Sequence, residues 1–171
     1  REVARCLGVS HQAPYKHYPS KDHLLAEVMR RCFRDFADFL DNRDRKDNPR
    51  EDLLQLGLRY QEFAMSHPVE YRLMFNTSWP SQAQEPGLVL DSAHAFNVLR
   101  AVLVRIYGDS VESSQIVDNN AMFIWANMHG LASILKSDVM KHLNLAINTD
   151  SHLTAHVLMM IGAALDANLT K

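Results

Sequence analysis

The side chains best suited to chemistry lie close together near the start of the chain, between residues 9 and 21. Those that can hydrogen-bond or carry charge are His11, Gln12, Tyr15, Lys16 and His17. Ser10 is a good helix N-cap, because its side-chain oxygen can accept a hydrogen bond from a free N–H of the first turn. Pro19 ends this predicted helix after about Tyr18. A helix so short and polar has little to bury, so its chemistry is contact with a partner molecule.

The residues before this stretch predict another helix and a turn. Val3, Ala4 and Leu7 are spaced as one apolar helix face, and Gly8 can adopt the positive φ that ends a helix. A helix, a glycine-containing turn and a short polar helix make up the helix-turn-helix arrangement, whose second helix enters the major groove of DNA. The alternative is a capped turn between two core helices.

Five short motifs fill the first 25 residues. They are Arg1-Glu2-Val3-Ala4, Leu7-Gly8-Val9-Ser10, Tyr15-Lys16-His17-Tyr18, Ser20-Lys21 and Leu24-Leu25. In type and spacing they resemble the DNA-reading head of TetR/AcrR-type transcriptional regulators. The residues that this resemblance places on DNA are Arg1, Ser10, His11, Gln12, Ala13, Tyr15, Lys16, His17 and Lys21. It implies that Lys21, at the start of the next helix, holds a phosphate.

Two residues depart from that family's pattern. Pro14 stands where many members have Leu or Ile, and it removes a hydrogen bond from the first turn, so we expect that turn to be tightened or shifted. Tyr18 replaces the usual Phe, and its hydroxyl needs water or a partner. Heads of this kind have three helices, and Arg1 falls inside the second, so we expect a further helix to precede it in the complete head.

The distribution of charge matters more than its total. A net charge of −2 argues against a nucleic-acid binder, since affinity for DNA depends largely on neutralising phosphates. However, residues 1–21 hold four Lys or Arg and one Glu, whereas the rest of the chain is acidic. A basic end on an acidic body suits a protein that touches DNA at one end only.

The remaining sequence predicts an all-α fold of two domains. Apolar residues at steps of three and four predict one long amphipathic helix from Lys21 to about Arg45. A later helix is predicted at 88–107, and Leu90 is among the residues expected to face inward. A charged joint follows at 43–51, in which Asn48 caps the next helix. We place the boundary there, with a helix-turn-helix head and connecting helix at 1–45 and a helical ligand-binding and dimerisation body at 46–171.

A candidate ligand pocket is predicted from aromatic and Met residues of the body. Trp125 and His129 share a helix face, and Gly130 allows another backbone to approach; this resembles the Trp-His-Gly C-terminal domain of one branch of TetR-like regulators. The candidate ligand residues are Tyr60, Phe63, Met74, Phe75, Trp79, Phe96, Met122, Phe123, Trp125 and His129. The alternatives are a core histidine bonded to a backbone carbonyl and a Trp79 that packs on its own body.

The last two long helices predict a homodimer. Asp118 is the one formally charged residue between 113 and 135, and Asp166 the one between 153 and 169. Helices so apolar are buried on more than one side, and a four-helix interface with a second copy would cover them. The candidate interface residues are Ile124, Leu131, Leu135, Leu153, Val157, Met160, Ile161 and Ala164.

Other chemistry is sparse in the sequence. Cys6 and Cys32 have no metal-like spacing and are interpreted as reduced core thiols, with a redox pair as the alternative. His152 and His156 are four apart but lack an obvious third ligand, so no metal and no cofactor is predicted. No phosphate-binding loop, nucleophile elbow or zinc-protease motif occurs, so we do not expect an enzyme. The longest apolar run, 157–165, is too short for a bilayer and no signal peptide precedes Arg1, so a cytoplasmic location is expected.

The sequence therefore predicts a DNA-binding transcriptional regulator. By the family resemblance it is a ligand-responsive repressor that binds a palindromic operator in double-stranded DNA as a homodimer. A small apolar or amphipathic effector is expected to release it from the DNA. No membrane partner is expected. The alternative is an α-helical small-molecule-binding or protein-interaction module that does not use DNA.

Overall fold

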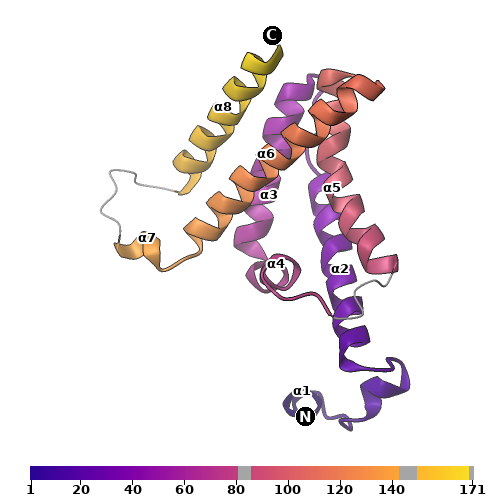
Figure 1. Ribbon diagram of the computed structural model, residues 1–171. Coiled ribbons are helices and arrows are strands. Elements are labelled where there is room, and N and C mark those ends of the chain that lie inside the picture. The colour runs from indigo at the N-terminus through magenta and orange to yellow at the C-terminus, as the bar shows by residue number, and fades with distance from the viewer. Residues whose placement is uncertain (81–85, 143–149, 170–171) are drawn as a thin grey trace.

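The computed structural model describes residues 1–80, 86–142 and 150–169, and this part of the chain is built from helices (Figure 1). The elements are α1 (Glu2–Cys6), the 3-10 helix η1 (Ala13–Lys16), α2 (Lys21–Asp41), α3 (Pro49–Ser66), α4 (Pro68–Phe75), α5 (Pro86–Tyr107), α6 (Val111–Leu135), α7 (Val139–His142) and α8 (Asp150–Leu169). The predicted all-α fold is confirmed.

Local hydrogen bonds explain where the long helices begin and end. Ser20 caps α2 by accepting from the backbone N–H of His23. Asn48 caps α3 by accepting from the backbone N–H of Arg50, as the sequence predicted. Ser110 and Ser113 form a reciprocal capping box at the start of α6. Helix α5 ends at Gly108, whose φ of 90° is available to glycine at little cost.

The core lies between α2, α3, α4, α5 and α6. Helices α2 and α5 run side by side and share the most extensive contact of the fold, while α6 crosses in front of α3 and α8 packs on α3 and α6 (Figure 1). Phe36 of α2 contacts Tyr60 and Phe63 of α3 at ring-centroid distances of 5.5 and 4.9 Å. Because the buried face of α2 belongs to this core, the helix that leads to the head is also part of the body.

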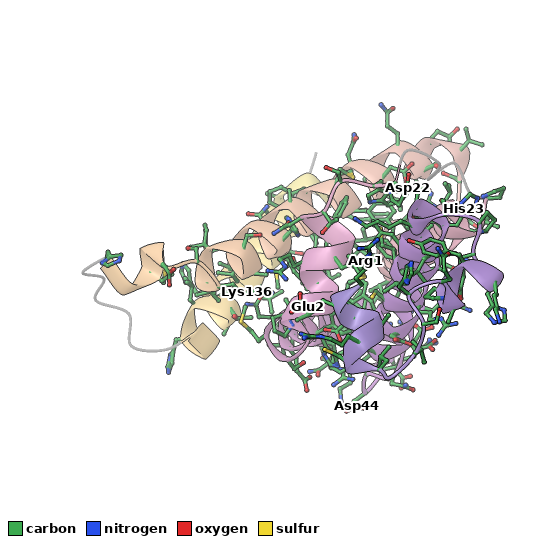
Figure 2. The ribbon with its side chains drawn as sticks, turned by 90° about the horizontal axis from the view of Figure 1, so that it is seen from below. Arg1, Glu2, Asp22, His23, Asp44 and Lys136 are labelled. Carbon is green, nitrogen blue, oxygen red and sulfur yellow. The ribbon has the colours of Figure 1, made fainter. Side chains whose placement is uncertain are left out.

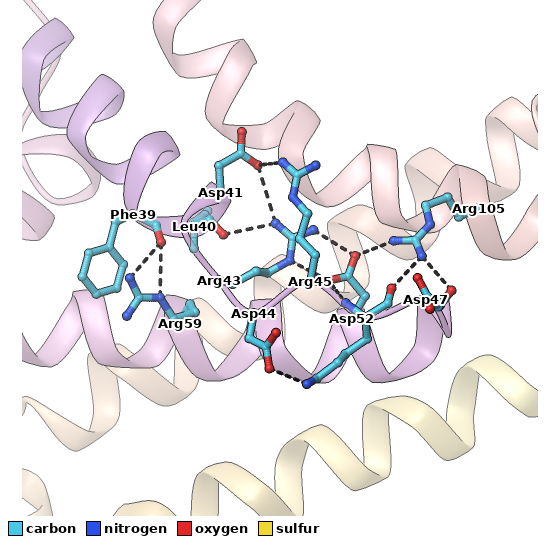
Figure 3. Close-up of polar contacts among 11 residues, drawn as sticks. Phe39, Leu40, Asp41, Arg43, Asp44, Arg45, Asp47, Asp52, Arg59 and Arg105 are labelled. Carbon is cyan, nitrogen blue, oxygen red and sulfur yellow. Dashed lines mark hydrogen bonds and ion pairs between the residues drawn. The ribbon is translucent and has the colours of Figure 1, made fainter.

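A buried carboxylate fixes the joint between α2 and α3 (Figure 3). Asp52 is 0% exposed and accepts hydrogen bonds from Arg43 at 2.8 and 2.9 Å and from Arg105 of α5 at 2.6 Å. Arg105 also donates to the backbone carbonyls of Lys46 and Asp47, and Arg43 to that of Leu40. One carboxylate thus ties the end of α2, the joint and α5 to the start of α3.

Four local predictions are wrong. The helix expected from Ser10 to Tyr18 is only the four residues of η1, because Pro14 has no N–H and the turn tightens to i→i+3 hydrogen bonds such as Tyr15 N–H to Gln12 O. Helix α2 ends at Asp41 rather than near Arg45. Cys6 is exposed, since no described helix packs over its side of α1, whereas Cys32 is buried as expected. Leu90 is exposed rather than inward.

Helix α5 is long and apolar enough to span a membrane by length and composition. Its charged residues nevertheless bind other helices of the body: Asp91 pairs with Arg30 of α2, Arg100 with Asp118 of α6, and Arg105 with Asp52 of α3. Together with the burial of Leu88, Val98, Val102 and Leu103, these contacts describe a helix of a packed bundle.

We predict that Asp52→Asn strongly destabilises the fold. The amide cannot balance the charge of Arg43, whose side chain is only 4% exposed, and breaking a buried ion pair typically costs about 3–5 kcal/mol of unfolding free energy. Urea denaturation followed by circular dichroism measures this. Asp44→Asn is the matched control, because Asp44 is exposed and pairs with Lys46 at the surface; it should change stability little.

The same carboxylate sets the response to acid. Burial alone would raise the pKa of Asp52, but the hydrogen bonds and charge of Arg43, the backbone N–H of Lys46 and the charge of Arg105 outweigh it and lower the pKa. A carboxyl group whose pKa is lower in the folded state stabilises that state at pH values above its unfolded pKa of about 3.9. This contribution is lost as the pH falls through the folded-state pKa. Wild-type stability should therefore drop below about pH 4, and Asp52→Asn should drop less; equal acid responses would contradict this assignment.

Candidate functional site

A cavity of about 670 Å³ lies inside the helical body. Its walls come from α2, α3, α4, α5, α6 and α8, with Trp79 from the segment after α4. The volume falls in the range of small-molecule sites, and the lining is mainly apolar and aromatic. The apolar lining suits a ligand that buries hydrocarbon or aromatic surface.

The cavity brings together seven of the ten predicted ligand residues: Tyr60, Met74, Phe75, Trp79, Phe96, Trp125 and His129. The other three do not line it. Phe63 is buried against Phe36 and stacks on His67 at 4.5 Å. Met122 and Phe123 are 52% and 42% exposed, because α6 turns Ala121, Ile124 and Met128 toward the core and so directs the two intervening residues outward.

The sequence interpretation missed two walls of the cavity. Phe33, Phe36 and Leu40 come from α2, which had been assigned only to connecting the head, and Leu158, Ile161 and Gly162 come from α8. Helical periodicity identified the inner face of α2 correctly. It did not indicate that this face borders a cavity, because that depends on helices distant in sequence.

The cavity has a polar group of three residues at one end. Tyr60 and Tyr71 have hydroxyl oxygens 2.8 Å apart, and these lie 3.3 and 2.6 Å from Nδ1 of His129. Burial raises the pKa of both phenols, that of Tyr71 to about 12, and lowers the pKa of His129. All three side chains are therefore neutral near pH 7, so this end binds by hydrogen bonds rather than charge.

An ion pair lies at the other end of the cavity. Arg50 of α3 and Asp166 of α8 both line it and approach to 2.5 Å. Residues 50 and 60 are ten apart on α3, so the two polar ends are separated by about 15 Å along that helix. Between them, Gly57 lets α8 approach, because a Cβ at this position would clash with Leu158. The cavity is thus elongated, with its two charges paired to each other.

The first turns of α5 connect the cavity with the helix that leads to the head. Val89, Ser92, Ala93 and Phe96 line the cavity. Asp91, between them in sequence, accepts from Arg30 of α2 at 3.0 Å and lies 3.8 Å from Arg34. A ligand that moved this end of α5 would therefore act on α2 through these ion pairs.

The residues predicted to bind DNA lie at the free end of α2 (Figures 1 and 2). Figure 2 looks onto this end, with Arg1 and Glu2 on α1 and with Asp22 and His23 at the start of α2. The exposed residues among those predicted are Arg1, Ser10, His11, Gln12, Tyr15, Lys16, His17 and Lys21, while Ala13 is half-buried. Ser10 accepts a hydrogen bond from the backbone N–H of Gln12, which orders the turn. These side chains are available to a partner.

The residues predicted to form a dimer interface fall into two groups. Ile124, Leu131 and Ile161 are buried within the protomer, and two of them line the cavity, so these three are not available to a second copy. Met160 is exposed, and Leu135, Leu153, Val157 and Ala164 are partly exposed. Because α6 and α8 are apolar on several faces, hydropathy did not distinguish the inner face from the outer one.

No cluster of three or more metal-ligating side chains occurs among the residues that the structure describes. His152 and His156 are both exposed on α8. The structure therefore adds no third ligand to this pair within the described ranges.

Comparison with known proteins identifies the family. The sequence model described as the tetracycline repressor-like C-terminal domain matches residues 53–160, which include most of the residues that line the cavity. The chain belongs to the tetracycline repressor-like (TetR) family. Membership of its Trp-His-Gly branch stays a prediction. A search of curated protein sequences gave no match.

Two solved structures resemble this TetR-like chain. A protein of unknown function from Rhodococcus sp. RHA1 superposes with a TM-score of 0.72 at 18% identity, over 96% of this chain and 82% of that one. SCO4313, a protein with a provisional assignment as a regulatory protein, gives a TM-score of 0.69 at 18% identity, over 94% and 82%. At this identity the likeness shows the fold alone.

We predict that Gln61→Met stabilises the protein. Gln61 follows Tyr60 on α3, and neither atom of its buried amide has a partner in the described part of the chain. Leaving such groups unpaired costs about 1–3 kcal/mol, which a methionine of similar shape would recover. Urea denaturation measures the change, with the half-exposed Gln55→Met on the same helix as control. A loss of stability would show that the amide is hydrogen-bonded in solution.

Proposed function

We propose that this TetR-family chain is a ligand-responsive transcriptional repressor in the cytoplasm, which binds a palindromic operator as a homodimer and is released by a small neutral effector. The observation that carries the proposal is the connection between an apolar cavity and an exposed basic end through α5 and α2. The proposal includes no enzymatic activity. It divides the chain into a DNA-binding head with its connecting helix at 1–45 and a ligand-binding and dimerisation body at 46–171.

The basic end supports the DNA-binding part of the proposal. Its exposed polar and charged side chains follow α1 through a turn at Gly8, whose φ is 65°. Lys21 lies at the start of α2, where free backbone N–H groups favour an anion such as a DNA phosphate. The acidic body would be repelled by DNA, so binding would be confined to this end.

The ion pairs of α5 support the regulatory part. An effector shifts a conformational equilibrium only by the difference between its affinities for the two states. Filling the cavity beside Phe96 would favour a different position of the first turns of α5, and Asp91 would transmit it to Arg30 of α2. The head, which is attached at the start of α2, would then no longer fit both halves of the operator.

The outer faces of α6 and α8 support the homodimer. Both helices expose large apolar side chains, namely Met122, Phe123, Ile134, Met159 and Met160. Large apolar side chains exposed on two helices are costly in water, and two helices from each of two copies can cover them as a four-helix bundle. A two-fold dimer would place two heads one helical turn of DNA apart, about 34 Å.

DNA binding should respond differently to two substitutions in the head. In the full-length protein, Lys21→Ala should weaken binding to all DNA sequences alike and reduce the salt slope by about one, because it removes a phosphate contact. Gln12→Ala should relax discrimination at particular base pairs, by about 1–3 kcal/mol. Fluorescence anisotropy with the DNA upstream of its own gene, at several salt concentrations, measures both.

The outcome of that titration separates the two functions considered. If the wild type binds DNA weakly and without sequence preference, and both variants bind in the same way, the regulator assignment is wrong. The protein would then be assigned as an α-helical binding module that does not use DNA.

The dimer should depend on the outer face of α8. Met159→Asp places a charge in the proposed interface, so sedimentation velocity should show a shift from dimer to monomer at micromolar concentration. Leu90→Asp is the matched control, since Leu90 is equally exposed but lies on α5, and it should leave the dimer intact. A Met159→Asp protein that remains dimeric would place the interface elsewhere.

A further inference from the structure

Three side chains at one end of the cavity contact one another in series. The hydroxyl of Tyr60 lies 2.8 Å from the hydroxyl of Tyr71. The Tyr71 hydroxyl in turn lies 2.6 Å from Nδ1 of His129. These residues come from α3, α4 and α6, so the series exists only in the folded body.

The hydrogens of this series are satisfied only when Nδ1 of His129 accepts. If Nδ1 of His129 carried a hydrogen, it would donate to Tyr71, Tyr71 would donate to Tyr60, and the buried Tyr60 O–H would have no acceptor among its contacts. With Nδ1 as acceptor, both hydroxyls find an acceptor: Tyr60 donates to Tyr71, and Tyr71 donates to His129.

This direction determines which nitrogen of His129 bears the hydrogen. Burial lowers the pKa of His129, so the ring is neutral and has one N–H. With Nδ1 accepting, that N–H is on Nε2, which points away from the two hydroxyls. Nε2 has no hydrogen-bond partner within the described ranges, and His129 lines the cavity. The series therefore ends in one unused donor.

We propose that the cavity selects neutral ligands that carry a hydrogen-bond acceptor, such as the carbonyl of a ketone, ester or amide, which accepts from Nε2–H of His129. The inference rests on the proposed effector function of the same cavity. The apolar walls between the series and Arg50 bind the rest of the ligand, and since Arg50 is paired with Asp166, an ionic ligand would have to compete with that pair.

A pair of probes that differ in one group tests the inference. Propiophenone and propylbenzene have the same shape, and only the former has a carbonyl. Calorimetry gives the ratio of their dissociation constants in the wild type and in His129→Phe, which keeps an aromatic ring but removes the donor. The preference for the ketone should fall roughly three- to tenfold in the variant, the value of one hydrogen bond. Both tryptophans of the chain, Trp79 and Trp125, line the cavity, so quenching of their fluorescence confirms where the probes bind.

Two further measurements keep the test independent of folding defects in His129→Phe. His129→Gln retains an N–H donor near the position of Nε2 and should keep part of the ketone preference. Nitrogen-15 NMR of the ligand-free wild type should show His129 as the neutral tautomer protonated on Nε2. A tautomer protonated on Nδ1 overturns the inference.

The possible failures are distinguishable from one another. If both probes bind and the ratio is the same in wild type and His129→Phe, the acceptor preference is wrong, while an apolar effector site stands. If neither probe binds up to its solubility, the effector part of the proposed function fails together with this inference. The DNA titration of the head is unaffected by either result.

Discussion

The whole arrangement depends on one buried carboxylate. A charge in the interior is tolerated only when it is paired and hydrogen-bonded, and Asp52 meets this condition through Arg43 and Arg105. Since these arginines come from the joint and from α5, the joint has to adopt the conformation that brings both to α3. That requirement fixes the end of α2 relative to α3 and α5, two walls of the cavity. In the proposed mechanism, a change in the relation between head and cavity would therefore occur in the first half of α2, where Arg30 meets Asp91 of α5, rather than at the joint.

The cavity leaves the packing of its walls incomplete. Apolar side chains that border a cavity make fewer contacts than they would in a close-packed core. A molecule that fills the space restores such contacts, so ligand binding and folding stability are linked. The Arg50–Asp166 pair and the approach of α8 at Gly57 keep the far end of the cavity together.

What could be predicted from the sequence was local. Gly8 and Asn48 mark helix ends through hydrogen bonds to residues two or three positions away, and these predictions are confirmed. The partners of His129 are 58 and 69 residues distant, so no spacing rule could find Tyr71 and Tyr60 together. The sequence also could not distinguish the inner from the outer faces of α6 and α8. Phe123 and Ile124 are adjacent and both apolar, yet Phe123 is exposed and Ile124 lines the cavity. At Pro14 the first turn of the predicted helix is tightened, as expected. The tightening leaves only the single 3-10 turn Ala13–Lys16 of that helix.

Charge and neutral hydrogen bonding have separate roles in this body. The ionic groups are compensated within the protein: Asp52 by two arginines, Asp91 by Arg30, and Arg50 by Asp166, and each pair joins two helices. The group at Tyr60, Tyr71 and His129 is uncharged and directional, and it ends in a donor that the described protein does not use. A charged ligand would have to compete with an existing ion pair and be desolvated in an apolar cavity, which costs several kcal/mol. A neutral acceptor meets an unpaired N–H and leaves every ion pair intact, so recognition can change the filling of the cavity without breaking the contacts that hold its walls.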